Sequence, residues 1–172
     1  SEMCIRDSRH PRFGMIPSMT AREVPQEIID MFYPPMQYMR EKLDPDFGHL
    51  AAVRATAING CTVCTAIHRR NAREHGWSED YILKVEQWTR HASEFSETEA
   101  LILELADTIT ELDDAPDSLP DDLWNRALDT LGEEVTRALI VGIVGVNSYN
   151  RLGIAFKQDP RDVARVTDFD LQ

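Results

Sequence analysis

The chain contains little cysteine, an excess of acidic over basic side chains, and no long apolar run. Lysine and arginine together number 18 against 30 aspartate and glutamate residues, and the formal net charge is -12. Binding to phosphates or to an anionic membrane needs basic surface, so we expect neither a nucleic-acid nor a membrane partner. The longest apolar stretch, residues 138–146, is less than half of the roughly 20 residues that span a bilayer.

The three cysteines are too few for a disulfide framework. The N-terminus also lacks the apolar core of a secretion signal. Both observations favour a cytoplasmic protein, in which a Cys-x-x-Cys pair is more often catalytic or metal-binding than structural.

Residues 1–18 show neither a helical nor a strand period, and Met3 to Ser8 resembles a translated sequencing-adapter scar. We expect this segment to be disordered or non-native, and we set Cys4 aside with it. Residues 19–172 are of a length that forms a single domain with its own core.

The apolar residues recur at helical spacing along the chain, and no segment alternates with period two. We therefore predict an all-α bundle of about seven helices. Ser96 and Glu99 form the clearest capping box at a helix start, whereas Pro34-Pro35 is expected to end the first helix. Residues 138–146 are apolar nearly all round and predict a buried central helix, where Gly142 and Gly145 would let a neighbouring backbone approach closely.

Cys61-Thr-Val-Cys64, followed by His68, is the most informative motif. Residues three and four apart are neighbours on a helix, so the two thiols and the imidazole would share one face. Asn59-Gly60 precedes the motif and predicts a turn from which a new helix begins. A thiol at a helix N-terminus ionises more readily, and the thiolate is its reactive form.

Three kinds of chemistry fit this pattern. The thiols could be inert, buried packing residues. They could bind a metal, with Cys61, Cys64, His68 and His49 as four ligands. In a redox cycle, one thiolate would attack an electrophile such as a peroxide oxygen, and the other would condense with the resulting sulfenic acid to give a disulfide. His68, four residues after Cys64, could then move the proton.

The motif also resembles a known family. Residues 58–68, Ile-Asn-Gly-Cys-Thr-Val-Cys-Thr-Ala-Ile-His, resemble the signature of the AhpD-like alkylhydroperoxidases of the carboxymuconolactone decarboxylase superfamily. The likeness covers roughly residues 45–157. Its other matching positions are Asn71-Ala72, Gly76, Phe95-Ser96-Glu97, Glu99, Leu105-Ala106, Asn147 and Asn150-Arg151-Leu152.

This resemblance implies an all-α peroxidase that needs no bound cofactor and assembles as a trimer or hexamer. Cys64 would be the attacking thiol, Cys61 the resolving thiol, and His68 part of a proton relay. The substrate would be a small peroxide, and an external dithiol or thiol-protein would reduce the disulfide. Asn147, Asn150 and Arg151 would line the pocket or a subunit interface.

The chain departs from the family pattern at two positions. His49 stands where the family has an acidic relay residue, twelve positions before the first cysteine, and Val63 stands where the family has a histidine between the cysteines. A neutral His49 could still act as a base, because its unperturbed pKa lies near neutrality. It could instead favour a metal or a different substrate.

Two other functions therefore remain as alternatives. A decarboxylase-type lyase of the same superfamily would need a basic or polar pocket for an anionic lactone, but no thiol pair. A metal-binding module without redox activity would use His49, Cys61, Cys64 and His68.

Overall fold

The computed structural model describes residues 24–112 and 119–162, and the predicted N-terminal segment 1–18 lies outside these ranges. The described residues contain helices and no strand, which confirms the all-α prediction. The α-helices are α1 (Gln26–Met31), α2 (Tyr33–Lys42), α3 (Pro45–Asn59), α4 (Thr62–Glu74), α5 (Glu79–Glu86), α6 (Glu97–Glu111), α7 (Asp121–Leu131) and α8 (Glu133–Ala155). Three 3₁₀ turns are η1 (Trp88–Arg90), η2 (Ala92–Glu94) and η3 (Pro160–Asp162).

The predicted capping box opens α6. The Ser96 hydroxyl accepts from the Glu99 backbone N–H at 3.2 Å, and the Glu99 carboxylate accepts from the Ser96 backbone N–H at 2.7 Å. Together these bonds satisfy two backbone donors that a helix start otherwise leaves unpaired. Glu99 also accepts from the Tyr81 hydroxyl at 2.6 Å. The pKa of the Tyr81 hydroxyl is raised, chiefly because burial disfavours its charged form and secondly because of this hydrogen bond to Glu99.

The first helix ends at Met31, just before Pro34-Pro35, as expected, but the prolines themselves belong to the start of the next helix. The two prolines occupy the first turn of α2, directly after Tyr33. The N–H that proline lacks has no intrahelical partner in a first turn, and its fixed φ suits a helix start.

Helices α3 and α4 form a hairpin that places the cysteine motif. Asp44 caps α3 by accepting from the Asp46 backbone N–H at 2.9 Å. Gly60 ends α3 with a φ of +67°, in the left-handed region that glycine adopts without steric cost. The chain then reverses at Cys61, which is the N-cap of α4.

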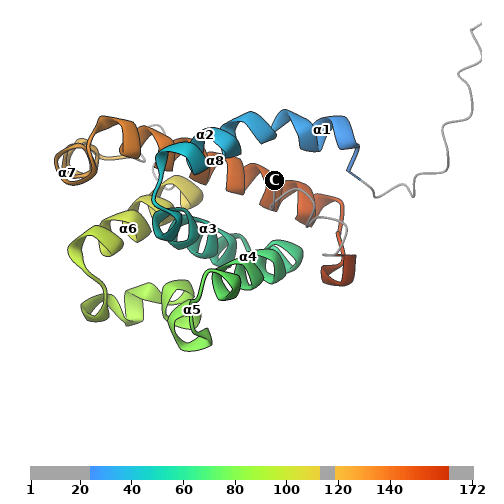
Figure 1. Cartoon of the computed structure of the whole chain (residues 1–172), viewed down its shortest axis with the longest axis horizontal. Helices are drawn as coiled ribbons and strands as arrows, with labels where there is room; N and C mark the ends of the chain where they lie inside the picture. The colour runs from blue at the N-terminus through green and yellow to red at the C-terminus, as the bar shows by residue number, and fades with distance from the viewer. Residues whose placement is uncertain (1–23, 113–118, 163–172) are drawn as a thin grey trace, which may run out of the picture.

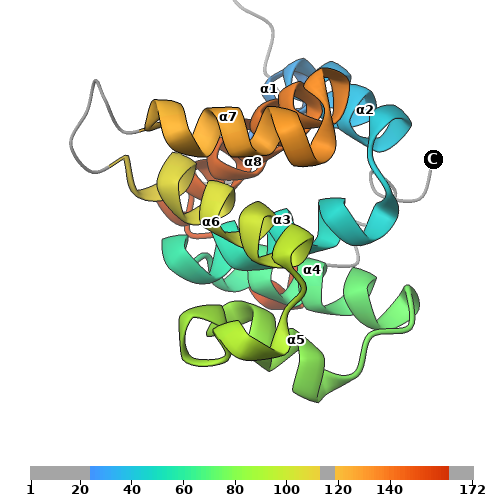
Figure 2. The same ribbon diagram turned by 90° about the vertical axis from the view of Figure 1, so that its left-hand side faces the viewer.

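Helix α8 runs through the centre of the bundle and packs against α2, α3 and α6 (Figures 1 and 2). Figure 1 shows α1 and α2 lying along one side of α8, with α3 and α4 on the other. Residues 138–146 of α8 include buried side chains on several faces of the helix, as the sequence predicted for a central helix. It is also long and apolar enough to pass a length-and-composition test for a membrane span, a test that core helices of bundles pass as well.

The glycines of α8 make room for side chains, and not for backbone as the sequence suggested. A Cβ at Gly142 would overlap the Met39 thioether, and a Cβ at Gly145 would lie 2.8 Å from the Met36 sulfur. Met36 and Met39 come from α2, so the two glycines let α2 pack against α8. These contacts also fix which face of α2 looks toward the cysteine motif.

Candidate functional site

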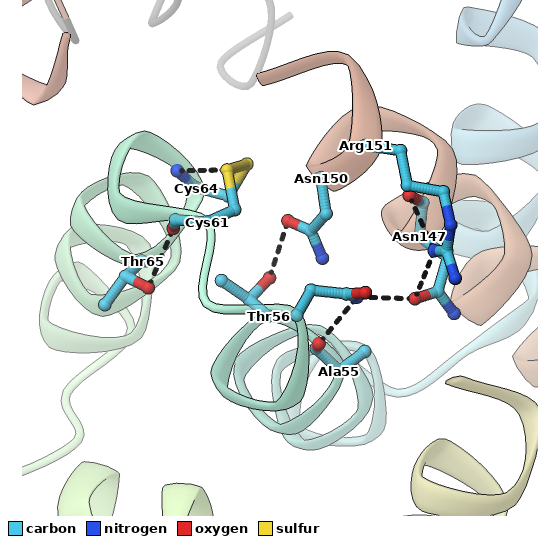
Figure 3. Close-up of a disulfide and its surroundings, with 9 residues drawn as sticks. Ala55, Thr56, Cys61, Cys64, Thr65, Asn147, Asn150 and Arg151 are labelled. Carbon is cyan, nitrogen blue, oxygen red and sulfur yellow. Dashed lines mark hydrogen bonds between the residues drawn. A yellow bond between two sulfur atoms is a disulfide. The ribbon is translucent and has the colours of Figure 1, made fainter. Parts of the chain in front are cut away.

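The two cysteines of the motif are joined by a disulfide at the N-terminus of α4 (Figure 3). Their Cα atoms lie 5.3 Å apart. The Cys64 backbone N–H points at the Cys61 sulfur at 3.3 Å, and the Thr65 hydroxyl donates to the Cys61 carbonyl at 2.9 Å. The Cys61 sulfur therefore takes the capping position, where the backbone donors and the helix dipole favour a negative charge.

The two sulfurs are not equally accessible. Cys61 is only 1% exposed and Cys64 is 6% exposed, and of the two only Cys64 lines the cavity beside the motif. A small molecule in this cavity would therefore meet Cys64.

The cavity has a volume of about 140 Å³ and lies among α1, α2, α4 and α8. Most of its exposed wall is apolar, and polar side chains from α1, α2, α4, α8 and Gln158 interrupt it. The lining residues are Val24, Gln26, Ile29, Tyr33, Met36, Arg40, Val63, Cys64, Ile67, His68, Val146, Tyr149, Leu152 and Gln158. Apolar walls with a few placed polar groups are typical of small-molecule sites.

His68 lines the same cavity as Cys64. The two residues are one turn apart on α4, so their side chains lie on the same face. The structure thus brings Cys61, Cys64 and His68 to one place, and it gives Cys64 and His68 a shared cavity.

His49 lies in a different environment. It stands in the first half of α3, and its ring centroid is 4.8 Å from that of His75 and 5.7 Å from that of Trp77. Asp46 accepts from the Trp77 indole at 2.7 Å and contacts the His75 Nε2 at 3.1 Å. His49 is not among the residues that line the cavity.

The placement of His49 bears on the metal alternative. Within residues 24–112 and 119–162, no group of three or more His, Cys, Asp or Glu side chains is arranged to hold a metal ion. The four ligands that the sequence suggested are distributed over the two ends of the α3–α4 hairpin. The reason is geometric, since ten residues, or roughly 15 Å of helix, separate His49 from the end of α3 at Asn59, and Cys61 follows that end.

Asn147, Asn150 and Arg151 form a polar network on α8 and do not line the cavity. The Thr56 hydroxyl donates to Asn150 at 3.2 Å. Asn147 donates to Thr110 at 3.1 Å and accepts from Arg151 at 3.1 Å. Figure 3 shows Asn150 between the disulfide and Thr56. These hydrogen bonds join α8 to α3 and to α6.

The residues of α8 that do line the cavity are Val146, Tyr149 and Leu152. Sequence reasoning missed them, together with Tyr33, Met36 and Arg40 of α2. Successive members of each set are three or four residues apart, so each set shares a helix face, but that spacing equally fits a core face. The Tyr149 hydroxyl donates to the Ile29 carbonyl at 3.1 Å, which ties α1 to this side of the cavity.

Gly153 lies against the disulfide and gives a testable packing prediction. A Cβ there would stand 2.9 Å from the Cys61 sulfur and 3.1 Å from Val63 Cγ1. Neither group can move freely, because Cys61 is held in the disulfide. Overpacking of this kind costs typically about 1–3 kcal/mol. We expect Gly153→Ala to unfold in less urea than the wild type and to change how easily dithiothreitol reduces the pair.

Gly145→Ala is the matched control. Both substitutions gain the same helix propensity, so their difference isolates packing. The Gly145 Cβ would meet the Met36 sulfur, which sits near the end of a flexible side chain that can move away. We expect Gly153→Ala to be less stable than Gly145→Ala by about 1–2 kcal/mol. Equal stabilities of the two variants would contradict the close contact at the disulfide.

Comparison with known proteins agrees with this geometry. Residues 28–108 match the carboxymuconolactone decarboxylase family. The uncharacterized protein YdfG of Bacillus subtilis (strain 168) is 32% identical over 106 residues, which make up 62% of this chain and 70% of YdfG. The crystal structure of ATU0492 from Agrobacterium tumefaciens covers 78% of this chain and 90% of its own, with a TM-score of 0.70 and 27% identity. ATU0492 is a protein of unknown function provisionally described as the antioxidant defence protein AhpD.

Proposed function

Because the chain belongs to the carboxymuconolactone decarboxylase superfamily together with the AhpD-like proteins, we propose that it is a thiol-dependent, peroxidase-type oxidoreductase. The observation that carries this proposal is the disulfide-bonded Cys61–Cys64 pair, with Cys64 and His68 lining one apolar cavity. A lone buried thiol would not provide a partner for a disulfide. Here the partner is already within bonding distance on the same helix turn.

In the first step, the Cys64 thiolate attacks the terminal oxygen of a hydroperoxide, ROOH. The O–O bond breaks, Cys64 becomes a sulfenic acid, and the leaving alkoxide takes a proton to give the alcohol ROH. His68 lines the same cavity as Cys64, which supports it as the side chain that delivers that proton. The apolar wall favours organic hydroperoxides over hydrogen peroxide.

In the second step, the Cys61 thiol attacks the Cys64 sulfenic acid, forms the disulfide and releases water. The helix N-terminus favours the Cys61 thiolate, because its sulfur faces the Cys64 backbone N–H. An external dithiol or thiol-protein must then return two electrons and two protons to the pair. Cys64, the cysteine that lines the cavity, would be the point of attack for that reductant.

The lyase alternative has less support. The cavity lining does not decide against a decarboxylase acting on an anionic lactone, because it includes Arg40 and His68. Such a reaction, however, gives no use to the bonded cysteine pair. The metal-binding alternative would need its four ligands to come together, and His49 contacts His75 and Trp77 at the other end of the hairpin.

We further propose that the protein works as a cytoplasmic homo-oligomer. Val144 and Ile154 of α8 are 50% and 47% exposed, and Met31 of α1 is 67% exposed. Exposed apolar side chains of this size suit a subunit contact. Light scattering should then give a mass near three or six times the 19.6 kDa chain, and a monomeric mass would contradict the proposal.

A thiol count tests the redox function directly. Reduced, metal-free protein in a Cys4→Ser background is titrated with DTNB before and after one equivalent of cumene hydroperoxide. We expect both remaining thiols to be lost and then restored by dithiothreitol. Retention of both thiols, at a peroxide concentration that oxidises a free-thiol control, would contradict the proposal and turn attention to zinc binding.

A further inference from the structure

Asn150 carries a buried amide nitrogen that has no hydrogen-bond partner among the described residues. The residue is 0% exposed, and its side-chain oxygen accepts from the Thr56 hydroxyl at 3.2 Å. The nitrogen therefore keeps two N–H groups away from water without an acceptor. A donor buried in this way costs free energy, and at a redox site it indicates an acceptor that is present in only one state of the protein.

The unpaired amide lies beside the disulfide. Gly153 follows Asn150 by three residues on α8, so the two residues share a face of the helix. A Cβ at Gly153 would stand 2.9 Å from the Cys61 sulfur, and this face of α8 is therefore turned toward Cys61. Figure 3 shows the Asn150 oxygen on the side of the disulfide and the nitrogen pointing away from it. In the oxidised protein, the sulfurs thus lie on the acceptor side of the amide.

A half-turn of the amide would exchange its two ends without losing the bond to Thr56. The terminal torsion of asparagine is broad and roughly two-fold, so both orientations are accessible. A hydroxyl group donates and accepts, and Thr56 can therefore bond to the nitrogen as well as to the oxygen. After the half-turn, one N–H would face Thr56 and the other would be available to Cys61.

Reduction of the disulfide supplies the acceptor that the amide lacks. Cys61 is 1% exposed, and the donor at its sulfur is the Cys64 backbone N–H at 3.3 Å. Burial disfavours the charged form of a thiol, so its thiolate needs donors from the protein. A charged sulfur repels the amide oxygen and attracts an N–H, and hydrogen bonds to charged groups are the stronger kind.

We propose that Asn150 stabilises the reduced form of Cys61: when the disulfide opens, the amide turns over and donates an N–H to the Cys61 thiolate. The proposal deepens the proposed function and rests on it in one respect, since Cys61 is there the thiol that attacks the Cys64 sulfenic acid. The hydrogen bond keeps Cys61 in its nucleophilic form until that attack. When the disulfide closes, the charge is lost and the amide oxygen returns to Thr56.

The ionisation of Cys61 tests this proposal and needs no peroxide. In a Cys4→Ser, Cys64→Ser background, Cys61 is the remaining cysteine of the three, and the ultraviolet absorbance of its thiolate against pH gives its pKa. We expect Asn150→Leu, which removes the donor at similar size, to raise that pKa by about one unit, a tenfold change in the ionisation constant. His68, the titratable side chain of the same motif, is present in every variant compared and cannot produce the difference.

Asn147→Leu is the matched control, because it makes the same chemical change one turn earlier on α8. The Asn147 amide bonds to Thr110 and Arg151, and so this variant should leave the pKa of Cys61 nearly unchanged. An unchanged pKa of Cys61 in Asn150→Leu, or an equal rise in Asn147→Leu, would overturn the proposal.

A second measurement leaves Asn150 in place and does not depend on how the leucine variant folds. NMR spectroscopy of the same background follows the side-chain amide resonances of Asn150 and Asn147 with pH. We expect the Asn150 resonance to shift with the same midpoint as the thiolate absorbance, while the Asn147 resonance stays constant. An Asn150 resonance that does not respond to the ionisation of Cys61 would contradict the hydrogen bond.

These measurements are separable from the test of peroxidase activity. If the ionisation of Cys61 depends on Asn150 but the thiol count shows no oxidation, the hydrogen bond stands and the redox function falls. If the thiols are oxidised but Asn150→Leu leaves the pKa of Cys61 unchanged, the redox function stands and the role given to Asn150 is wrong.

Discussion

Cys64→Ser is expected to abolish peroxide turnover altogether. Cys64 is the cysteine that lines the cavity, and a serine hydroxyl, unlike a thiol, is not ionised near neutral pH and cannot form a sulfenic acid. In a Cys4→Ser background, this variant should keep its remaining thiol after cumene hydroperoxide treatment. Loss of peroxide, followed by a ferrous-xylenol assay, should fall to the rate without protein.

Cys61→Ser is expected to behave differently, although it removes the other half of the same disulfide. Cys64 can still attack the peroxide, but no thiol remains on the same helix turn to resolve the sulfenic acid. We expect a single oxidation without further turnover and a product that dimedone labels at Cys64. Full turnover by Cys64→Ser, or dimedone labelling at Cys61 in Cys64→Ser together with none at Cys64 in Cys61→Ser, would contradict the assigned order of attack.

Substituting each of the two histidines distinguishes a residue of the proton relay from a residue with a structural role. His68 shares the cavity with Cys64, so His68→Gln should slow the oxidation of Cys64 by about 10²–10⁴-fold, the usual contribution of a positioned acid or base. His49→Gln should leave that rate within a few-fold of the wild type, because His49 packs with His75 and Trp77. A large loss of the Cys64 oxidation rate in His49→Gln would show that His49 does take part in the proton relay, as the sequence suggested.

The second large effect is on stability and concerns Asp107 on α6. Its carboxylate receives Arg54 Nε at 2.5 Å, Arg54 Nη2 at 3.1 Å and the Trp88 indole at 2.8 Å. The Arg54 and Asp107 side chains are only 14% and 18% exposed. Removing one partner of a fully buried pair costs about 3–5 kcal/mol, which is the upper bound here because the pair is part-buried and Arg54 also donates to the Glu86 carbonyl. We expect Asp107→Ala to lower the free energy of unfolding in urea by up to that amount.

Glu104→Ala on the same helix is the control for this effect. Glu104 pairs with Arg126 at 2.6 Å, but the two side chains are 41% and 52% exposed. Exposed pairs contribute about 0–1 kcal/mol, so this variant should unfold close to the wild type. If the loss in Asp107→Ala comes from the uncompensated arginine, the double variant Arg54→Met, Asp107→Leu should lose less stability than Asp107→Ala. A larger loss in the double variant would show that packing, and not charge, explains the effect.

The sequence by itself determined the local features of this protein. Helix starts at Ser78 and Ser96 follow from side chains that cap the backbone within one turn. The neighbouring positions of Cys61, Cys64 and His68 follow from the helical period alone. Each of these features depends on residues a few positions apart, so spacing and side-chain type are sufficient to predict them. Pro34-Pro35 marks the limit, because a proline pair can end one helix or begin the next.

Only the tertiary structure decided what surrounds the thiols. Helix α2 comes to the cavity because Gly142 and Gly145 of α8 leave room for its methionines, and this contact brings Arg40 to the site. The same packing turns Asn147 and Asn150 toward α3 and α6, and Val146 and Tyr149 toward the cavity. The contacts of His49 with His75 and Trp77 likewise depend on how α3 packs against α4 and the turn after it. Contacts between residues some 100 positions apart depend on how whole helices pack, and spacing along the chain does not encode that choice.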